Sequence, residues 1–289
     1  MKLFAIEYDR RGTARREAGE STEAIRLFEK AIAHAPDWSV PWYNLGLTYK
    51  YLHNWAESYR CNAEAVRLNP ADEAAIWNMG IAATALGNWS EARRAWTLYG
   101  IEVPAGAGPP DSDLGTVPIR INPDGNAEVV WARRIDPARA VLTSIPLPES
   151  DHRHGDFVLH DGAPAGYRKQ GDDDVPVFNE LQVLIPSGCG TFEVKIEARS
   201  AEDLASFEEA CEAHDCKAED WSTLRVLCRA CSEGHPHHHP DPPTEGEHRF
   251  AVAALDSKLV AAAVGDWVMR DPTRAAGTVT VLLDPLPLT

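Results

Sequence analysis

The residues best suited to chemistry lie between Cys228 and Pro240, where thiols and imidazoles are concentrated. Two cysteines separated by two residues can place both thiolates on one tetrahedral ion, and imidazoles a few residues later can complete its coordination shell. Such a donor set suits zinc best. Alternate residues of an extended stretch point the same way, so two of the four nearby histidines are preferred. The predicted zinc ligands are Cys228, Cys231, His237 and His239, with His235, His238 and His248 in reserve.

Two other interpretations of this stretch remain open. It can be a long polar loop between two strands, with histidines that bind nothing. The thiols can also form a redox pair, although such a pair is expected to open a helix, where the helix dipole lowers the thiol pKa, and these cysteines follow a predicted strand. If zinc is bound, four protein ligands would make it structural, whereas three ligands and a water would favour a metal-handling protein or a metal-dependent enzyme.

A second stretch with histidines runs from Asp151 to Gly162. We expect its second half to be a strand that ends in the Asp161-Gly162 turn, and a polar pocket of Asp156, His160 and Asp161 is the alternative. The sequence has no nucleotide-binding glycine loop, no serine nucleophile elbow and no metalloprotease helix signature. Nothing positive therefore supports an enzyme, and an interaction function is the stronger prediction.

The elements expected around these residues begin with a repeat in the first third of the chain. Glycines recur 34 residues apart at Gly12, Gly46 and Gly80, and prolines recur with the same period at Pro36, Pro70 and Pro104. Each period is typical of two amphipathic helices that cross at small residues, and the proline is expected to stop the second helix. The helices predicted in the second and third periods cover residues 39–52, 55–68, 73–86 and 89–102.

This pattern resembles the tetratricopeptide repeat (TPR), with three repeats in residues 5–104. The resemblance implies a concave surface lined by the first helix of each repeat, which in the first repeat places Asp9, Thr13, Arg16 and Glu17 toward a ligand. Repeats that grip the C-terminal carboxylate of chaperones use Lys, Arg and Asn at such positions, and Asp9 departs from that. The predicted partner-binding residues are Arg16, Tyr43, Leu47, Lys50, Tyr51, Trp77 and Ile81.

These side chains are mostly aromatic or apolar, so we expect the partner to be a protein or an amphipathic or extended peptide with apolar anchors. The alternative is that Tyr43 and Trp77 pack against the β-rich part of the same chain. Trp96 and Tyr99 lie near the end of the third repeat, with no polar capping helix after them. We therefore expect the next domain or a partner to pack on that end, and the short linker favours the next domain.

The rest of the chain predicts a multidomain fold, in which the all-α array of residues 1–104 is followed by a linker at residues 105–115. Short strands in residues 116–186 indicate a small, partly open β-barrel-like domain. Residues 187–289 show the strand and helix order of a ferredoxin-like α+β domain, in which two helices cover one face of a four-stranded sheet. This order of domains faintly resembles a bacterial domain family of unknown function.

Composition limits the choice of partners. The net charge is −16 for 289 residues, and nearly all of the acidic excess lies after residue 104, which argues against nucleic acid. No signal peptide and no membrane-spanning run is present, so we expect a cytoplasmic protein in which the six cysteines are thiols or metal ligands. The combined prediction is a TPR adaptor or scaffold with a structural zinc site, and the oligomeric state is left open.

Overall fold

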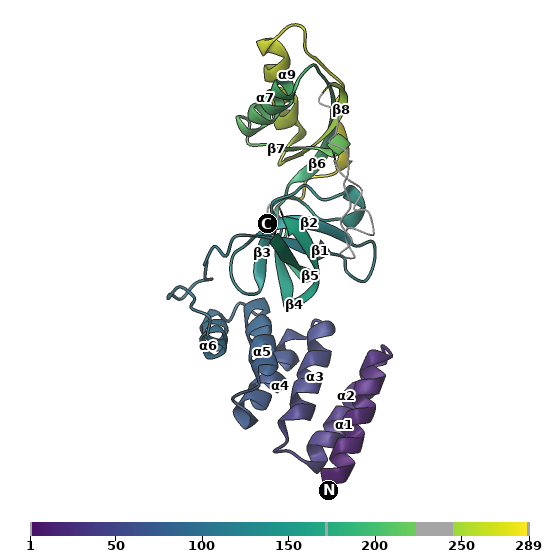
Figure 1. The fold of residues 1–289 in the computed structure, drawn as a ribbon, viewed down its shortest axis with the longest axis vertical. Coiled ribbons are helices and arrows are strands. Elements are labelled where there is room, and N and C mark those ends of the chain that lie inside the picture. The colour runs from purple at the N-terminus through teal and green to yellow at the C-terminus, as the bar shows by residue number, and fades with distance from the viewer. Residues whose placement is uncertain (1, 171–172, 224–244, 288–289) are drawn as a thin grey trace. The chain divides into compact units, whose positions relative to one another are not determined.

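The computed structural model describes residues 2–170, 173–223 and 245–287 (Figure 1). The chain divides into two compact units. The first consists of Met1–Leu114 together with the short segment Ile135–Ala138, and the second consists of Gly115–Arg134 and Arg139–Thr289.

The first unit is an array of six helices, and each helix packs mainly on its neighbours in sequence. Their bounds are α1 Lys2–Glu17, α2 Ser21–His34, α3 Ser39–Tyr51, α4 Trp55–Leu68, α5 Glu73–Ala85 and α6 Trp89–Tyr99. The helices form three successive hairpins, α1 with α2, α3 with α4 and α5 with α6. None of the described helices has the length and apolar character needed to cross a membrane.

Close helix crossings at the repeated glycines explain the period. A Cβ atom added to Gly12 would lie 2.7 Å from the Phe28 ring, one on Gly46 would lie 2.5 Å from the Asn62 amide, and one on Gly80 would lie 2.5 Å from the Trp96 indole. In every hairpin a glycine of the first helix therefore leaves space for one side chain of the second helix, which lies 16 residues later in the sequence. The structure confirms that the 34-residue period marks three equivalent helical hairpins.

The end of the third hairpin differs from the prediction. We expected α6 to reach residue 102 and Pro104 to stop it, but the helix ends at Tyr99 because Gly100 adopts a left-handed conformation with φ of 92°. Such a residue turns the chain out of the helix and is usually glycine. Beyond it, the Arg93 guanidinium donates to the Pro104 and Gly108 carbonyls, each at 2.7 Å, and so holds the following segment beside α6.

Trp96 also departs from the prediction that the next domain or a partner would have to cover it. Its indole is fully buried within its own hairpin, above Gly80 and against Trp77, with ring centroids 5.1 Å apart. Tyr99 packs edge-on against the same Trp77 ring at 4.7 Å. Trp96 is therefore covered by residues of its own repeat, whereas Tyr99 stays 38% exposed.

The second unit begins with five strands that close into a barrel in the order β1-β2-β3-β4-β5. Neighbouring strands are antiparallel, and a parallel pairing of β1 with β5 completes the ring. Its core includes Ile119, Ile121 and Leu142, all fully buried. The strands are β1 Thr116–Ile121, β2 Glu128–Arg134, β3 Arg139–Leu142, β4 Phe157–Gln170 and β5 Asp173–Ile185, and a short 3₁₀ turn, η1, covers Pro148–Ser150.

One strand of the barrel is much longer than expected. We predicted a turn at Asp161-Gly162, but β4 continues to Gln170 and pairs with β5 along most of its length. The register shifts around Pro164 and Gly166, which shows that bulges accommodate the residues that suggested a turn.

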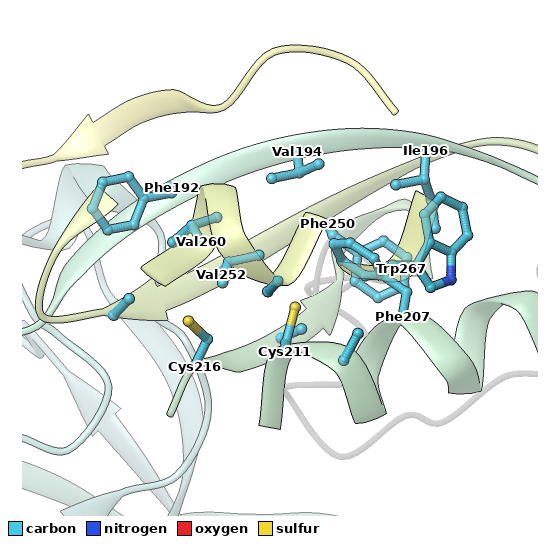
Figure 2. Packing of buried hydrophobic residues seen from close by; sticks show 14 residues of the cluster. Phe192, Val194, Ile196, Phe207, Cys211, Cys216, Phe250, Val252, Val260 and Trp267 are labelled. Atoms are coloured by element: carbon cyan, nitrogen blue, oxygen red, sulfur yellow. The ribbon is translucent and has the colours of Figure 1, made fainter. Parts of the chain in front are cut away.

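The rest of the second unit is a sheet with two helices on one face. The described strands lie in the order β10-β6-β8-β7, and the short β9 also pairs with β6. Figure 2 shows the core between layers, where Phe207 of α7 and Trp267 of α9 face Phe250 and Val252 of β8. The elements are β6 Gly190–Ala198, α7 Ala201–Glu212, β7 Lys217–Asp220, η2 Trp221–Thr223, β8 Gly246–Ala254, α9 Ser257–Arg270, β9 Ala275–Ala276 and β10 Thr280–Leu283.

The strand β7 is short. It ends at Asp220, and Trp221–Thr223 form a 3₁₀ turn. A bend there is stabilised by the Asp220 carboxylate, which accepts a hydrogen bond from the Ser222 N–H at 2.9 Å.

Candidate functional site

A polar bridge joins the first helices of the first two repeats. The Asn44 side-chain N–H donates to the Asp9 carboxylate at 2.9 Å, and the Asn44 carbonyl oxygen accepts from the Arg16 guanidinium at 3.2 Å. Asn44 is buried in α3. Burial raises the pKa of Asp9 above its ordinary value, although the hydrogen bond from Asn44 and the charge of Arg16 oppose the rise. The sequence predicted Arg16 as a site residue but missed Asn44, which could have been found as a polar side chain that recurs 34 residues later at Asn78.

Beside this bridge, α1 borders an open hollow of about 520 Å³, which we call the first-repeat hollow. Three of its lining residues, Asp9, Thr13 and Glu17, are positions that the repeat pattern assigned to the ligand-facing surface. The sequence did not single out Trp38, which contributes the aromatic part of the wall from the residue before α3. The full lining consists of Ile6, Asp9, Arg10, Thr13, Ala14, Glu17 and Trp38.

In the second repeat, the predicted residues are divided between packing and exposure. Tyr43 is half-buried and packs against the apolar cluster formed by α4, α5 and α6. Lys50 is only 3% exposed, and its ammonium lies 4.7 Å from the centre of the Tyr51 ring, which is 56% exposed. Leu47 is half-buried. Tyr51 is therefore the exposed member of this group, Leu47 and Tyr43 are partly accessible, and Lys50 is buried.

The third repeat offers less surface than predicted. Ile81 is fully buried, and the half-buried Trp77 packs against Trp96 and Tyr99 within its own hairpin. The physical reason is that α5 has small or apolar residues on all sides and packs against α3, α4 and α6. In the third repeat Ile81 is therefore covered, whereas Trp77 stays partly accessible.

The predicted zinc ligands Cys228, Cys231, His235, His237, His238 and His239 lie outside the described residues. The remaining reserve ligand, His248, is buried, and its Nδ1 lies 2.6 Å from the Asp220 carboxylate. Across the residues that the structure does describe, no group of three His, Cys, Asp or Glu side chains is placed to hold a metal ion.

The residues proposed for a polar pocket in the second stretch have structural roles. Asp156 is buried and accepts hydrogen bonds from the backbone N–H groups of Arg153 and Ser187, both at 2.8 Å. His160 lies inside the barrel, where burial lowers its pKa to about 4, so its imidazole is neutral at pH 7. The Asp161 carboxylate accepts from the N–H of Gly162 at 2.8 Å. These contacts stabilise the local bends of the barrel.

A buried ion pair in the barrel was missed by the sequence analysis. The His152 Nε2 lies 2.8 Å from the Glu180 carboxylate, and both side chains are almost fully buried. Burial by itself lowers the pKa of His152, but the hydrogen bond to Glu180 and its charge outweigh it, so the pKa is raised. The two residues come from the loop after η1 and from β5, and nothing in their spacing indicates that they meet.

No protein-family model matches the chain, and no curated protein matches it either. Among solved structures, the second TPR of Spaghetti (RPAP3) bound to the HSP90 peptide SRMEEVD is similar at a TM-score of 0.33 and 23% identity, and covers 34% of this chain and 91% of its own. The first TPR of the same protein, bound to the same peptide, has a TM-score of 0.33, 24% identity, 34% coverage of this chain and 79% of its own. The three-hairpin architecture of the first unit rests on its own period and contacts.

Proposed function

We propose that this protein is an interaction module, an adaptor or scaffold whose helical array binds a segment of another protein along α1 and α3. The observation that carries the proposal is the first-repeat hollow, where ligand-facing positions of the repeat pattern surround an open space. The exposed Tyr51 and the half-buried Leu47 extend this surface onto α3 and provide apolar anchor sites.

The polar groups of α1 argue against an acidic ligand terminus. A peptide such as SRMEEVD, bound in the two similar structures, would bring carboxylates toward Asp9 and Glu17 of this chain. Like charges at short range oppose association. We therefore propose a ligand with apolar anchors that differs from an acidic chaperone tail.

Selection of random displayed peptides on the immobilised full-length protein tests this function. Enriched peptides should bind wild type and lose at least about tenfold in affinity on the double variant Thr13→Arg plus Tyr51→Ala, a difference of roughly 1.4 kcal/mol. Leu98→Ala removes a similarly exposed apolar side chain from α6 and is the matched control. Peptides that bind all three proteins equally would show that this surface is not the binding site, and a failure to enrich any peptide would contradict the function.

We also propose that the second sheet has the ferredoxin-like arrangement. Support comes from its described elements, which run strand, helix, strand, strand, helix, strand, and from the strand order β10-β6-β8-β7. An experimental structure of residues 187–289 within the full chain tests this topology directly.

Zinc binding by Cys228 and Cys231, with two nearby imidazoles, remains a proposal from the sequence. Its support is the Cys-x-x-Cys spacing and the adjoining histidines. Mass spectrometry of tag-free protein prepared without chelator should find about one zinc per chain, and Cys228→Ser plus Cys231→Ser should lose it. Metal below about 0.2 equivalents in wild type would overturn the proposal.

A further inference from the structure

Two carboxylates, Asp9 and Glu17, line the first-repeat hollow without forming an ion pair with any described residue, and they decide the chemistry of its occupant. We infer that it takes a lysine or arginine side chain of the partner, followed or preceded by an apolar residue. The inference rests on the proposed peptide-binding function and specifies which peptides are bound.

The balance of charges around the hollow supports a cation. Within the described part of the chain, neither Asp9 nor Glu17 forms an ion pair, and the hydrogen-bond partner of Asp9 is the neutral amide of Asn44. Arg10, the cation in the lining, is already held by Glu7 through two hydrogen bonds of 3.1 and 2.9 Å. Arg16 lies beyond the lining and donates to Asn44, and its charge acts on Asp9 without forming an ion pair. Within the lining, a partner's cation would therefore meet two carboxylates and one arginine that is already paired with Glu7.

Burial strengthens this preference at Asp9. Partial removal from water raises the pKa of this carboxyl, which means that burial raises the free energy of its ionised form in the unliganded protein. A cation that enters the hollow favours the ionised form and regains that free energy. An incoming carboxylate would have the opposite effect.

The walls fit the long stem of a basic residue. Ile6 is 44% exposed, and Trp38, which also belongs to the lining, is half-buried. Lysine and arginine can pack their methylene stems on apolar surface while the charged head reaches a carboxylate. An indole face also attracts a cation. Ala14 leaves room, because it is exposed and carries only a methyl group.

The test uses the full-length protein and a positional-scanning library of fluorescein-labelled octapeptides. Each pool fixes one position as Lys, Arg, Leu, Asp or Glu, and binding is measured by fluorescence anisotropy at low and high salt. The Lys and Arg pools should bind about tenfold more tightly than the Asp and Glu pools at low salt, with a smaller ratio at high salt. Sedimentation of the unliganded protein is measured in parallel.

Asp9→Asn and Glu17→Gln should each reduce the Lys and Arg preference severalfold while the Leu pools change little. Asparagine at position 9 can still accept the hydrogen bond from Asn44, so the bridge between α1 and α3 is retained. Glu29→Gln removes the same charge from an exposed position on α2 and should leave the preference unchanged. Melting temperatures check that all three variants are folded.

Equal binding of basic and acidic pools, or a basic preference that survives both hollow substitutions, would overturn the inference. In that case the proposed peptide-binding function would still stand if the Leu pools bind wild type and lose affinity in the double variant Thr13→Arg plus Tyr51→Ala. If no pool binds, both fail. A concentration-dependent dimer that Asp9→Asn abolishes would identify a second copy of the chain as the occupant and also overturn the inference.

Discussion

Single residues fix how closely the helices of each hairpin approach, and Gly80 is the clearest case. Its neighbour Trp96 is fully buried and packed against Trp77, so the indole has little freedom to move away. Gly80→Ala would place a Cβ 2.5 Å from that ring. Overpacking of this kind costs about 1–3 kcal/mol, which outweighs the gain of about 1 kcal/mol in helix propensity.

We therefore expect Gly80→Ala to speed hydrogen exchange of the α5 and α6 amides. Gly265→Ala in α9 is the opposite case, since nothing lies within 4 Å of its added Cβ, and it should slow exchange of the α9 amides. Unchanged exchange in α5 and α6 would mean that the hairpin can relax around the extra methyl group.

A second prediction at this scale concerns Glu219, where burial raises the carboxyl pKa to about 7. The Ile145 N–H donates to this carboxylate at 3.0 Å and lowers the pKa, but by less than burial raises it. Between the unfolded value of about 4.3 and 7, the folded state holds more protons than the unfolded state. The contribution of Glu219 to stability therefore falls as pH rises through this window and stays low above it.

Glu219→Gln keeps an acceptor for Ile145 and removes the titration. The variant should be more stable than wild type at pH 8 by on the order of 1–3 kcal/mol, and the difference should shrink toward pH 4.5. Urea unfolding at several pH values measures this, with Glu209→Gln on the exposed face of α7 as the control. A difference that does not vary with pH would contradict the assigned cause.

At the scale of elements, the sequence predicted helices well because each repeat is local. The predicted helix over residues 39–52 is observed as Ser39–Tyr51, since the period, the small crossing residues and the turn residues all agree. β4 was predicted too short because Gly162, Pro164 and Gly166 are typical turn residues. Pairing with β5, the next strand along the chain, keeps this segment in the sheet through register shifts that turn propensities do not predict.

The candidate site also contains residues that a local pattern predicts and residues that it does not. Asp9, Thr13 and Glu17 follow from the repeat pattern, so their positions were predictable. Asn44 and Trp38 complete the site through contacts between repeats. Asn44 recurs as Asn78 one period later, and both are buried, so the repeat offered a signal for it, whereas no period marks Trp38. Ile81 was predicted to face a ligand because the pattern assigns positions within a helix, but it does not show which helix is surrounded by others.

The end of α6 gives the element-scale prediction. Gly100 has φ of 92°, and nothing lies within 4 Å of an added Cβ, so Gly100→Ala changes only the backbone preference. A left-handed alanine costs about 1–2 kcal/mol, so we expect the free energy of unfolding of the first unit to fall by that amount, which urea unfolding measures. Pro104→Ala should have little effect, because the helix has already ended. Equal destabilisation by the two substitutions would mean that Pro104, and not only Gly100, ends the helix.

At the scale of the whole molecule, charge is distributed unevenly. The chain has a net charge of −16, and the array is close to neutral while the remainder is strongly acidic. This distribution disfavours acidic partners in general and would speed encounter with basic ones at low salt.

The last prediction concerns how far the array depends on the rest of the chain. Its hairpins pack on their sequence neighbours, and Trp96 is covered within its own repeat, so the helices have the contacts needed to fold locally. A fragment of residues 1–114 lacks Ile135–Ala138, which belong to the same compact unit. In the full chain the Ser112 N–H donates a hydrogen bond to the Ile135 carbonyl at 2.7 Å, and the fragment cannot form it.

We expect this fragment to remain helical by circular dichroism and to keep slow hydrogen exchange in α1 to α4, whereas the Ser112 amide should exchange rapidly. The full-length protein, measured under the same conditions, is the control. An aggregated or unfolded fragment would show that the array needs the β-rich part of the chain for its stability, as an unshielded third repeat would require. Slow exchange at Ser112 in the fragment would show that its hydrogen bond to Ile135 does not protect that amide.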